Sequence, residues 1–370
     1  MIHAGRVDAM SLYTLPTSAR DIVPSRTLRY SDRTHIRMLE QPDISDAIIT
    51  ACLRDSFGLH IVQVTFLPLG WVNNALYRVS VESGTPYLLK LRRGNFNEAA
   101  VAVPAFLHAR GIRQVVPPIP TTSNMLWVRA HGFVWTLYPF VDGTTGFEMA
   151  LSQPHWIALG RIMKAVHNAR LPAALAERVP QEDYSPRWRT RVRAIHNQVQ
   201  QNRSADPIAA HLAAFWLAKR DEILAIVDRA DQLAQALQQR VVERVTCHSD
   251  LHGRNVLIGA NDEVTIVDWD EPILAAKERD LMFIGGGVGG IWNNDHEAAW
   301  FYQGYGPTEI DLAALCYYRY ERIVADIAAC AEQIFGRQAS VEARAKGLGI
   351  INQFLPNNVV DIAHRTYDQL

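Results

Sequence analysis

Charge of one sign is not in excess in this chain of 370 residues, because 37 lysines and arginines nearly balance 38 aspartates and glutamates. A chain with so little net charge has no long-range field to attract nucleic acid or an anionic membrane. Long apolar runs are lacking too: none reaches the roughly 18 residues that span a bilayer, and residues 1–40 contain no secretory signal. We therefore expect a cytoplasmic protein with neither nucleic acid nor membrane as a partner.

Cysteine is scarce, and the cysteines present lie far apart with no C-x-x-C pair. This spacing argues against a disulfide framework or a zinc knuckle and fits reduced, buried thiols. We assign no chemistry to the four residues Cys52, Cys247, Cys316 and Cys330.

Apolar residues are plentiful, at 48% of the chain, and the length favours two lobes over one. Residues 1–37 are polar and rich in arginine, so we expect a flexible extension there. Residues 38–140 are predicted to form one lobe and residues 141–370 a second. Nothing in the sequence indicates an oligomeric state.

The first lobe has the pattern of an antiparallel sheet with two helices. A helical pattern over residues 43–58 stops at Gly58, and a second helix is predicted over residues 97–111. Short segments rich in valine, tyrosine, tryptophan and threonine predict five strands at 61–67, 75–81, 86–92, 125–129 and 133–140.

The second lobe is predicted to be mainly helical. Its helical patterns cover residues 154–170, 187–202, 206–240, 295–304, 309–335 and 340–354. The fold class that follows is α+β, with a small antiparallel-sheet N-lobe and a large helical C-lobe. Ligands commonly bind where two lobes meet.

The stretch CHSDLHGRNVLIGANDEVTIVDWDEP, residues 247–272, interrupts the helical lobe with an unusual density of oxygen ligands. Asn255 follows Asp250 by five residues, and Asp268 follows Asn255 by thirteen. Transfer of a phosphoryl group from ATP needs Mg²⁺, which prefers carboxylate and carbonyl oxygens such as those of Asp268 and Asn255. Asp250, on the preceding loop, suits the carboxylate that orients and deprotonates an acceptor hydroxyl. Two strands joined by the turn GANDE are expected to fold Asn255 back beside Asp268.

Nucleotide contacts are expected in the first lobe. Lys90 lies between two leucines in the third predicted strand and suits the phosphates, with Glu98 as its acidic partner. The loop between the first and second predicted strands has a single glycine, Gly70, so it is no glycine-rich phosphate cradle. At the connector, the carbonyl of Pro139 and the N–H of Val141 are predicted to bind adenine. The sequence does not separate ATP from GTP.

Other interpretations of the same stretch stay open. Asp and Asn favour turns, so the polar positions His248, Asp250, Asn255 and Asp268 are also compatible with an ordinary surface hairpin. His248 and His252, four residues apart, would form half of a zinc site on a helix, although Gly253 argues against a helix there. A nucleotide-binding pseudokinase is a further alternative, against which the intact Asp250, Asn255 and Asp268 speak.

The motif H-x-D-x-x-x-x-N followed by IVDWD resembles the aminoglycoside phosphotransferases, which are kinase-like enzymes that modify small molecules. The segments YSPRWR, VDWDEPILAAKERDLMFIGGGVG and PNNVVDIA are similar to the branch that acts on aminocyclitol antibiotics such as spectinomycin. The resemblance implies a two-lobed protein-kinase-like fold, ATP and Mg²⁺, a catalytic Asp250, metal ligands Asn255 and Asp268, and Lys90 on the phosphates. The expected activity is phosphorylation of a hydroxyl of an aminocyclitol, most specifically spectinomycin, with another aminoglycoside, an amino alcohol or a sugar as alternatives.

A cationic aminocyclitol needs carboxylates around it. Asp270 and Glu271 are the predicted contacts, and Trp292 is a candidate aromatic face for the ammonium groups or rings. Each has an ordinary structural alternative, namely a turn before Pro272 or a place in the core. Arg279 and Asp280 are expected to brace the Asp250 loop rather than to touch the substrate.

Overall fold

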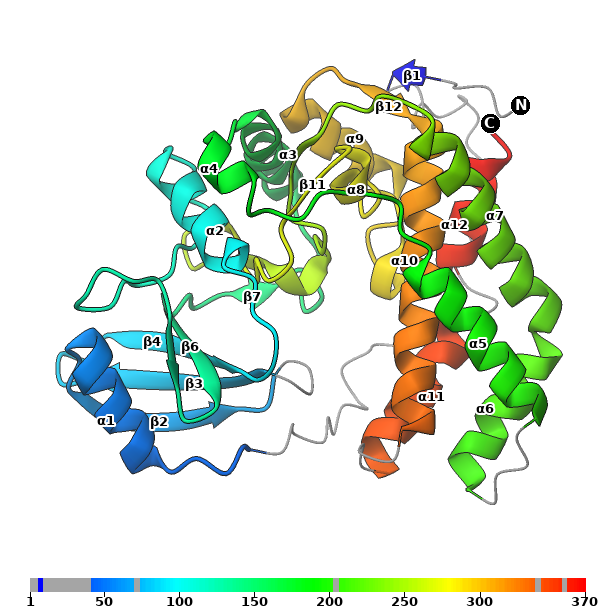
Figure 1. The fold of residues 1–370 in the computed structure, drawn as a ribbon. Coiled ribbons are helices and arrows are strands. Elements are labelled where there is room, and N and C mark those ends of the chain that lie inside the picture. Colours follow the sequence, from blue (N-terminus) through cyan, green and yellow to red (C-terminus); the bar gives the residue numbers. More distant parts are fainter. Residues whose placement is uncertain (1–5, 9–40, 70–73, 202–205, 337–340, 355–357) are drawn as a thin grey trace. The chain divides into compact units, whose positions relative to one another are not determined.

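The computed structural model describes residues 6–8, 41–69, 74–201, 206–336, 341–354 and 358–370, which form two compact units (Figure 1). One unit ends at Asp142, and the other runs from Gly143 to Leu370 and includes strand β1 (Arg6–Asp8). A small antiparallel sheet in the first and a majority of helices in the second agree with the predicted α+β fold.

The first unit contains a five-stranded antiparallel sheet of order β2-β3-β4-β6-β5. Its elements are α1 (Asp46–Phe57), β2 (Ile61–Leu67), β3 (Asn74–Val81), β4 (Pro86–Arg92), α2 (Ala99–Ala109), β5 (Val128–Ala130) and β6 (Phe133–Pro139). Helix α1 begins at Ser45, whose hydroxyl accepts from the N–H of Ile48, and ends at Gly58 with a φ of 68°. The left-handed conformation at that end favours glycine, which is why the sequence marks it.

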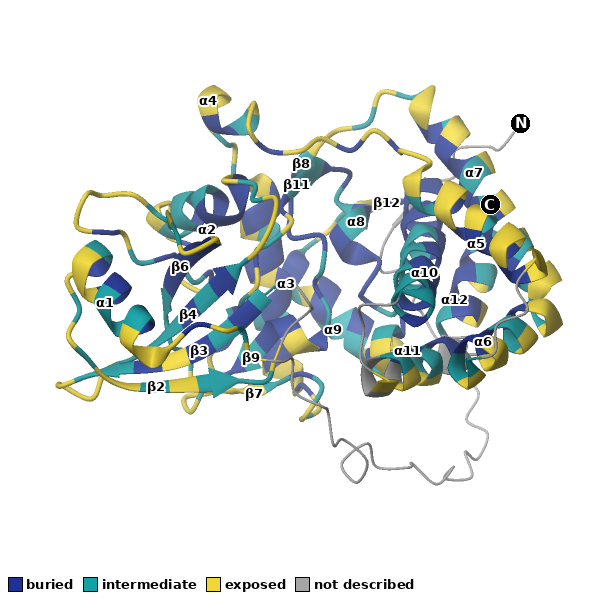
Figure 2. Ribbon diagram, turned by 60° about the horizontal axis from the view of Figure 1, so that its bottom comes forward, coloured by how far each residue is buried: buried dark blue, intermediate teal, exposed yellow. Residues whose placement is uncertain are grey.

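Alternation along β4 gives the sheet a core face and a half-buried face. Leu89 and Leu91 are fully buried against Tyr77, Trp135 and α1, within the core that Figure 2 colours as buried. Lys90 lies on the opposite face and is half-buried, as its strand pattern predicts.

Helices and short sheets make up the second unit. They are β7 (Thr144–Thr145), α3 (Gln153–Asn168), α4 (Ala173–Ala176), α5 (Arg187–Gln201), α6 (Pro207–Ala218), α7 (Arg220–Gln238), β8 (Val245–Cys247), η3 (Gly253–Asn255), β9 (Val256–Ile258), β10 (Val264–Ile266), β11 (Ile273–Ala275), α8 (Glu278–Leu281), η4 (Val288–Gly290), α9 (Asp295–Tyr305), β12 (Glu309–Asp311), α10 (Leu312–Phe335), α11 (Val341–Phe354) and α12 (Asn358–Tyr367).

Helix α10 is the central helix of this unit. It packs against α5, α7, α11 and α12, and most of its length is buried or half-buried (Figure 2). Asp311 caps its start, because one carboxylate oxygen accepts from the N–H groups of Ala313 and Ala314. A side chain on α10 is therefore held by packing on several sides.

Two helical predictions differ from the structure, and one further helix has no counterpart among the predictions. The pattern over 206–240 divides into α6 and α7 at Lys219, and the pattern over 309–335 opens with the strand β12. Helix α12 was not predicted. In each case the chain follows tertiary pairing and packing that local periodicity does not record.

Only part of the predicted flexible extension, residues 1–37, falls within the described residues. That part, β1, pairs antiparallel with β12, which the sequence did not indicate. The rest of the extension lies outside the described residues. Among the helices that the structure describes, none is long and apolar enough to cross a membrane.

Candidate active site

Two small antiparallel pairs carry the stretch of polar residues 247–272. Strands β8 and β11 pair so that Cys247 lies opposite Ile273, and β9 pairs with β10 so that Val256 lies opposite Ile266. Residues 248–252, here called the Asp250 loop, connect β8 to η3. Gly253 follows the loop, and a Cβ there would lie 2.6 Å from the end of the Ile291 side chain and 3.1 Å from the backbone of Gly146, so a larger residue would require the Ile291 side chain to move.

The Asp250 carboxylate contacts side chains from its own loop, from the adjacent η3 helix and from the distant helix α10. Its Oδ1 lies 2.6 Å from Nη1 of Arg322 on α10. Its Oδ2 lies 3.3 Å from Nε2 of His252 and 3.4 Å from Nδ2 of Asn255. The side chain is 39% exposed, so it remains open to solvent while it is held.

Opposing influences act on the ionisation of Asp250. Burial by itself raises the pKa of this carboxyl, but Arg322 and His252 outweigh burial and hold the pKa well below its ordinary value. His252 accepts the N–H of Arg254 at Nδ1, which leaves its N–H on Nε2, facing Asp250. Asp250 is therefore an ionised carboxylate with one strongly held oxygen.

Asn255 is almost fully buried and fixed at two points. Its side-chain Nδ2 donates to the backbone carbonyl of Asp250 at 2.8 Å, and its backbone carbonyl accepts from the N–H of Val267 at 3.0 Å. The next residue, Asp268, is exposed and has a φ of 64°, a strained conformation for a residue other than glycine. The hairpin thus brings the backbone of Asn255 beside the residue before Asp268, as predicted.

The donor chemistry of this pair fits Mg²⁺. Hydrogen bonding of Asn255 through Nδ2 leaves its carboxamide oxygen as the atom that would serve as a neutral ligand, and Asp268 would supply a carboxylate. Such oxygen sets are those that Mg²⁺ prefers together with substrate phosphates.

Asp280 on α8 holds the Asp250 loop through hydrogen bonds from two of its backbone N–H groups. Its Oδ2 accepts from the N–H of His248 at 2.8 Å and from Nε2 of His167 at 3.1 Å, and its Oδ1 accepts from the N–H of Ser249 at 2.7 Å. Ser249 has a φ of 72°, so these bonds fix a strained loop. The predicted bracing role of Asp280 is confirmed, whereas Arg279, for which the same role was predicted, instead makes an ion pair with Glu182 at 2.8 Å.

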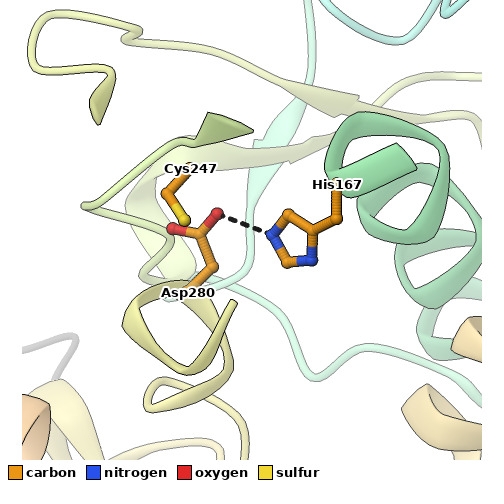
Figure 3. A group of neighbouring side chains, drawn as sticks. All are labelled: His167, Cys247 and Asp280. Atoms are coloured by element: carbon orange, nitrogen blue, oxygen red, sulfur yellow. Dashed lines mark hydrogen bonds and ion pairs between the residues drawn. The ribbon is translucent and has the colours of Figure 1, made fainter. Parts of the chain in front are cut away.

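His167, Cys247 and Asp280 also form a cluster whose ligand atoms lie within 4.8 Å of one another (Figure 3). Both oxygens of Asp280 are already occupied by the loop N–H groups, and burial raises the pKa of the Cys247 thiol well above its usual range. A neutral thiol and a satisfied carboxylate make a structural cluster rather than a metal centre.

The alternative of a zinc half-site at His248 and His252 is not supported by their placement. His248 accepts the N–H of Asp250 at Nδ1 and bonds the carbonyl of Val267 through Nε2 at 2.9 Å. His252 precedes the short η3 helix in extended conformation. The two residues share no helix, and both ring nitrogens of His248 serve the backbone.

The residues predicted to bind nucleotide lie in the first unit. Lys90 on β4 faces Leu76 of β3 and Thr136 of β6, and Glu98 directly precedes α2. Pro139 ends β6, and Val141 follows it in the connector. The pairing of Lys90 with Glu98 stays a prediction, and Gly70 lies outside the described residues.

The predicted acceptor contacts differ in their surroundings. Asp270 is half-buried and Glu271 is exposed, and the carbonyl of Glu271 accepts from the Ser249 hydroxyl at 2.6 Å. Trp292 is 5% exposed, and its ring packs edge-on against Trp156 at 5.0 Å. Their contacts with an acceptor stay predictions, and the burial of Trp292 argues for a core role.

Arg322 is the residue of this site that sequence reasoning missed. It lies 72 residues after Asp250 in an ordinary amphipathic helix, and its partner Asp326 is one helical turn further on. The only signal in the sequence is this i,i+4 spacing, which is typical of any exposed helix pair.

Comparisons with known proteins give a consistent result. The model of the phosphotransferase enzyme family matches residues 63–272. A crystal structure of spectinomycin phosphotransferase with ADP and spectinomycin is 36% identical, with a TM-score of 0.82, over 89% of this chain and 100% of that chain. The AMP-bound complex of spectinomycin phosphotransferase is 35% identical, with a TM-score of 0.78, over 87% of this chain and 98% of that chain.

A more distant likeness extends the comparison of the fold. Amicoumacin kinase with AMP-PNP and Ca²⁺ is 16% identical, with a TM-score of 0.59, over 86% of this chain and 97% of that chain, which shows the fold alone. The expected kinase-like fold is confirmed. A sequence search among curated proteins finds no match.

Proposed function

This chain belongs to the phosphotransferase enzyme family and is an ATP-dependent small-molecule kinase, and on that premise we propose that it phosphorylates a hydroxyl of an aminocyclitol antibiotic, spectinomycin in the first place. The observation that carries the proposal is the 36% identity, over 89% of this chain, to an enzyme whose structure holds ADP and spectinomycin. Phosphorylation would add nearly two negative charges to a cationic drug and so oppose its binding elsewhere. We propose that the protein works in the cytoplasm, where ATP is available.

Asp250 is proposed to act on the acceptor. As the acceptor oxygen bonds to the γ-phosphorus, the bond from phosphorus to the bridging oxygen breaks and its electron pair leaves with ADP. The hydroxyl proton passes to the carboxylate of Asp250, which is ionised and partly exposed. Because Arg322 and His252 hold this carboxylate in place, it can orient the hydroxyl oxygen without a further loss of its own conformational entropy.

Asn255 and Asp268 are proposed to hold Mg²⁺ against the nucleotide phosphates. When bound, Mg²⁺ supplies positive charge that offsets the charge of the phosphate oxygens. The bond from Asn255 Nδ2 to the carbonyl of Asp250 links this ligand to the acceptor side, so the two functions share one rigid segment. Lys90 is proposed to add a further positive charge at the phosphates.

The connector is proposed to bind adenine through the carbonyl of Pro139 and the N–H of Val141. The N–H of Phe140, which lies between them, donates to the carbonyl of Pro86 at 3.3 Å. That bond directs the N–H of Phe140 toward strand β4. The residues on either side of Phe140, Pro139 and Val141, carry the backbone groups proposed for adenine. A nucleotide complex with adenine bound elsewhere would remove this part of the proposal.

The acceptor is tested by incubating the purified protein with Mg²⁺ and ATP or GTP and a panel of aminocyclitols, aminoglycosides, amino alcohols and sugars. We expect spectinomycin to gain one phosphoryl group by mass spectrometry, with stoichiometric release of ADP. The matched control is Asp250→Asn, which keeps the size of the side chain and removes its charge.

The same panel decides between the alternatives. Turnover of an amino alcohol or a sugar but not of spectinomycin would keep the kinase activity and overturn the acceptor. Binding of nucleotide without transfer to any member of the panel would favour a pseudokinase.

A further inference from the structure

We propose that Arg322 is the positioning residue of this site: it fixes Oδ1 of Asp250 and thereby assigns Oδ2 as the oxygen that receives the acceptor proton. The inference rests on the proposed function of Asp250. It adds a residue from helix α10, far along the chain from the Asp250 loop, to the machinery of the transfer reaction.

The distances around the carboxylate separate its two oxygens. Oδ1 lies 2.6 Å from Arg322, which is a short, charge-assisted hydrogen bond. Oδ2 lies 3.3 Å from His252 and 3.4 Å from Asn255, beyond the range of about 2.7–3.2 Å for a good N–H···O bond. An incoming hydroxyl therefore competes with two long contacts at Oδ2, whereas at Oδ1 it would have to displace an ion pair.

Arg322 is itself held firmly enough to position another group. Its Nε donates to Asp326 at 2.9 Å, and its guanidinium lies 5.6 Å from the centre of the buried Phe283 ring. The side chain is 24% exposed and its helix is buried among its neighbours. With Nε on Asp326 and Nη1 on Asp250, the planar guanidinium fixes the direction of the Asp250 carboxylate.

Charge gives a reason for two carboxylates around one arginine. Asp326 alone would neutralise Arg322 and leave Asp250 with no strong partner. In the structure, Arg322 bridges both, so Asp250 has a strong partner for one of its oxygens while Asp326 holds another part of the guanidinium. Asp326 is thus the support of the positioning residue and does not contact the Asp250 carboxylate itself.

The test compares Arg322→Gln, Arg322→Lys and Asp326→Asn with wild type by steady-state kinetics. If misplacement of the Asp250 carboxylate is the defect, kcat falls by about 10–100-fold in Arg322→Gln while the KM for ATP stays within about twofold. Arg322→Lys is expected to retain an intermediate kcat, and Asp326→Asn to lose several-fold.

Arg319→Gln is the matched control. Arg319 also lies on α10, but it bonds Thr366 and the carbonyl of Ile284 and does not contact the Asp250 loop. A structural role alone predicts that Arg319→Gln and Arg322→Gln lower Tm and kcat in the same proportion, and that outcome would overturn the proposal. An unchanged or increased kcat in Arg322→Gln would overturn it as well.

Chemical rescue adds a readout that stability does not move. Free guanidinium, well below denaturing concentrations, is expected to restore part of the kcat of Arg322→Ala and none of the kcat of Asp250→Asn. Failure of rescue in a folded Arg322→Ala protein that binds ATP normally counts against the proposal.

A double-mutant cycle separates this inference from the identity of the acceptor. Tm is measured for Asp250→Asn, Arg322→Gln and the double variant, with no substrate present. We expect the two effects to be non-additive by at least about 2 °C. If wild type phosphorylates no aminocyclitol, the proposed function fails, but a cycle that is additive within error overturns the role of Arg322 whatever the acceptor is.

Discussion

Asp250 lies in the Asp250 loop and Asp280 bonds to two N–H groups of the same loop, and the surroundings of these two carboxylates give them opposite properties. Asp280 is fully buried, and its two oxygens accept three hydrogen bonds from His167, His248 and Ser249. Asp250 is 39% exposed and has one short bond, to Arg322, with only long contacts at its other oxygen. Both oxygens of Asp280 accept hydrogen bonds from the protein, whereas Oδ2 of Asp250 has no short hydrogen bond.

Physical chemistry explains why both arrangements occur within a few residues. A buried carboxylate without partners is very costly, so Asp280 persists only because N–H donors surround it. A carboxylate that must exchange a proton with a ligand needs an oxygen that is not committed. The difference between a bracing and a reacting carboxylate is therefore a difference in how many of its lone pairs the protein itself occupies.

Substitution of Asp250, the carboxylate that has only long contacts at Oδ2, should have the largest effect. We expect Asp250→Asn to lower kcat by about 10²–10⁴-fold, because a carboxamide cannot take up the acceptor proton. ADP release and product mass measure the loss, and nucleotide binding in the same variant serves as the control. Turnover at a near-normal rate would remove Asp250 from the reaction.

Substitution of Asp268, one of the two proposed Mg²⁺ ligands, should have the second-largest effect. We expect Asp268→Asn to lower kcat by about 10²-fold and to raise the Mg²⁺ concentration needed for half-maximal rate, because a neutral side chain binds a hard cation less well. Titration of the rate with Mg²⁺ at saturating ATP measures both effects. Asp262→Asn, in the exposed hairpin turn, is the matched control and should leave the Mg²⁺ titration unchanged.

The buried carboxylate should respond in stability more than in chemistry. We expect Asp280→Asn to lower the free energy of unfolding by about 3 kcal/mol, because the new amide turns a donor toward the loop N–H groups. Urea denaturation measures this loss. Activity should fall by only about tenfold, through disorder in the Asp250 loop. A large loss of kcat with unchanged stability would indicate that Asp280 takes part in the reaction, and would contradict the distinction drawn between Asp250 and Asp280.

The smallest effect expected is a difference in acid sensitivity. Burial by itself raises the pKa of Asp280, but the bonds from His167 and His248 outweigh it and lower the pKa below its ordinary value. A group with a lowered folded-state pKa stabilises the fold above its unfolded-state pKa of about 3.9 and loses that contribution as the pH falls through the folded-state pKa. Urea denaturation at several pH values should therefore show a steeper acid loss in wild type than in Asp280→Asn. Parallel profiles would contradict this role.

Local signals in the sequence were sufficient for much of the fold. Strands β2 and β4 follow from residues typical of strands and from the turn residues that bound them, and the end of α1 follows from Gly58; the structure has all three where they were predicted. The hairpin that places Asn255 near Asp268 follows in the same way from two short strands and a turn.

What the sequence could not give depends on contacts between distant segments. The break between α6 and α7 falls at Lys219, which no proline or glycine marks. Arg322 reaches Asp250 only because α10 packs into the centre of its unit, a fact that helical periodicity does not contain. Periodicity predicts which face of a helix is buried, but not which loop the other face will meet.

A structure of the protein with Mg²⁺, a non-hydrolysable ATP analogue and spectinomycin tests the central claim most directly. We predict a metal ion bound by the carboxamide oxygen of Asn255 and the carboxylate of Asp268, and an acceptor hydroxyl within hydrogen-bonding distance of Oδ2 of Asp250, with Oδ1 still on Arg322. A metal bound by other side chains, or an acceptor remote from Asp250, would contradict the account.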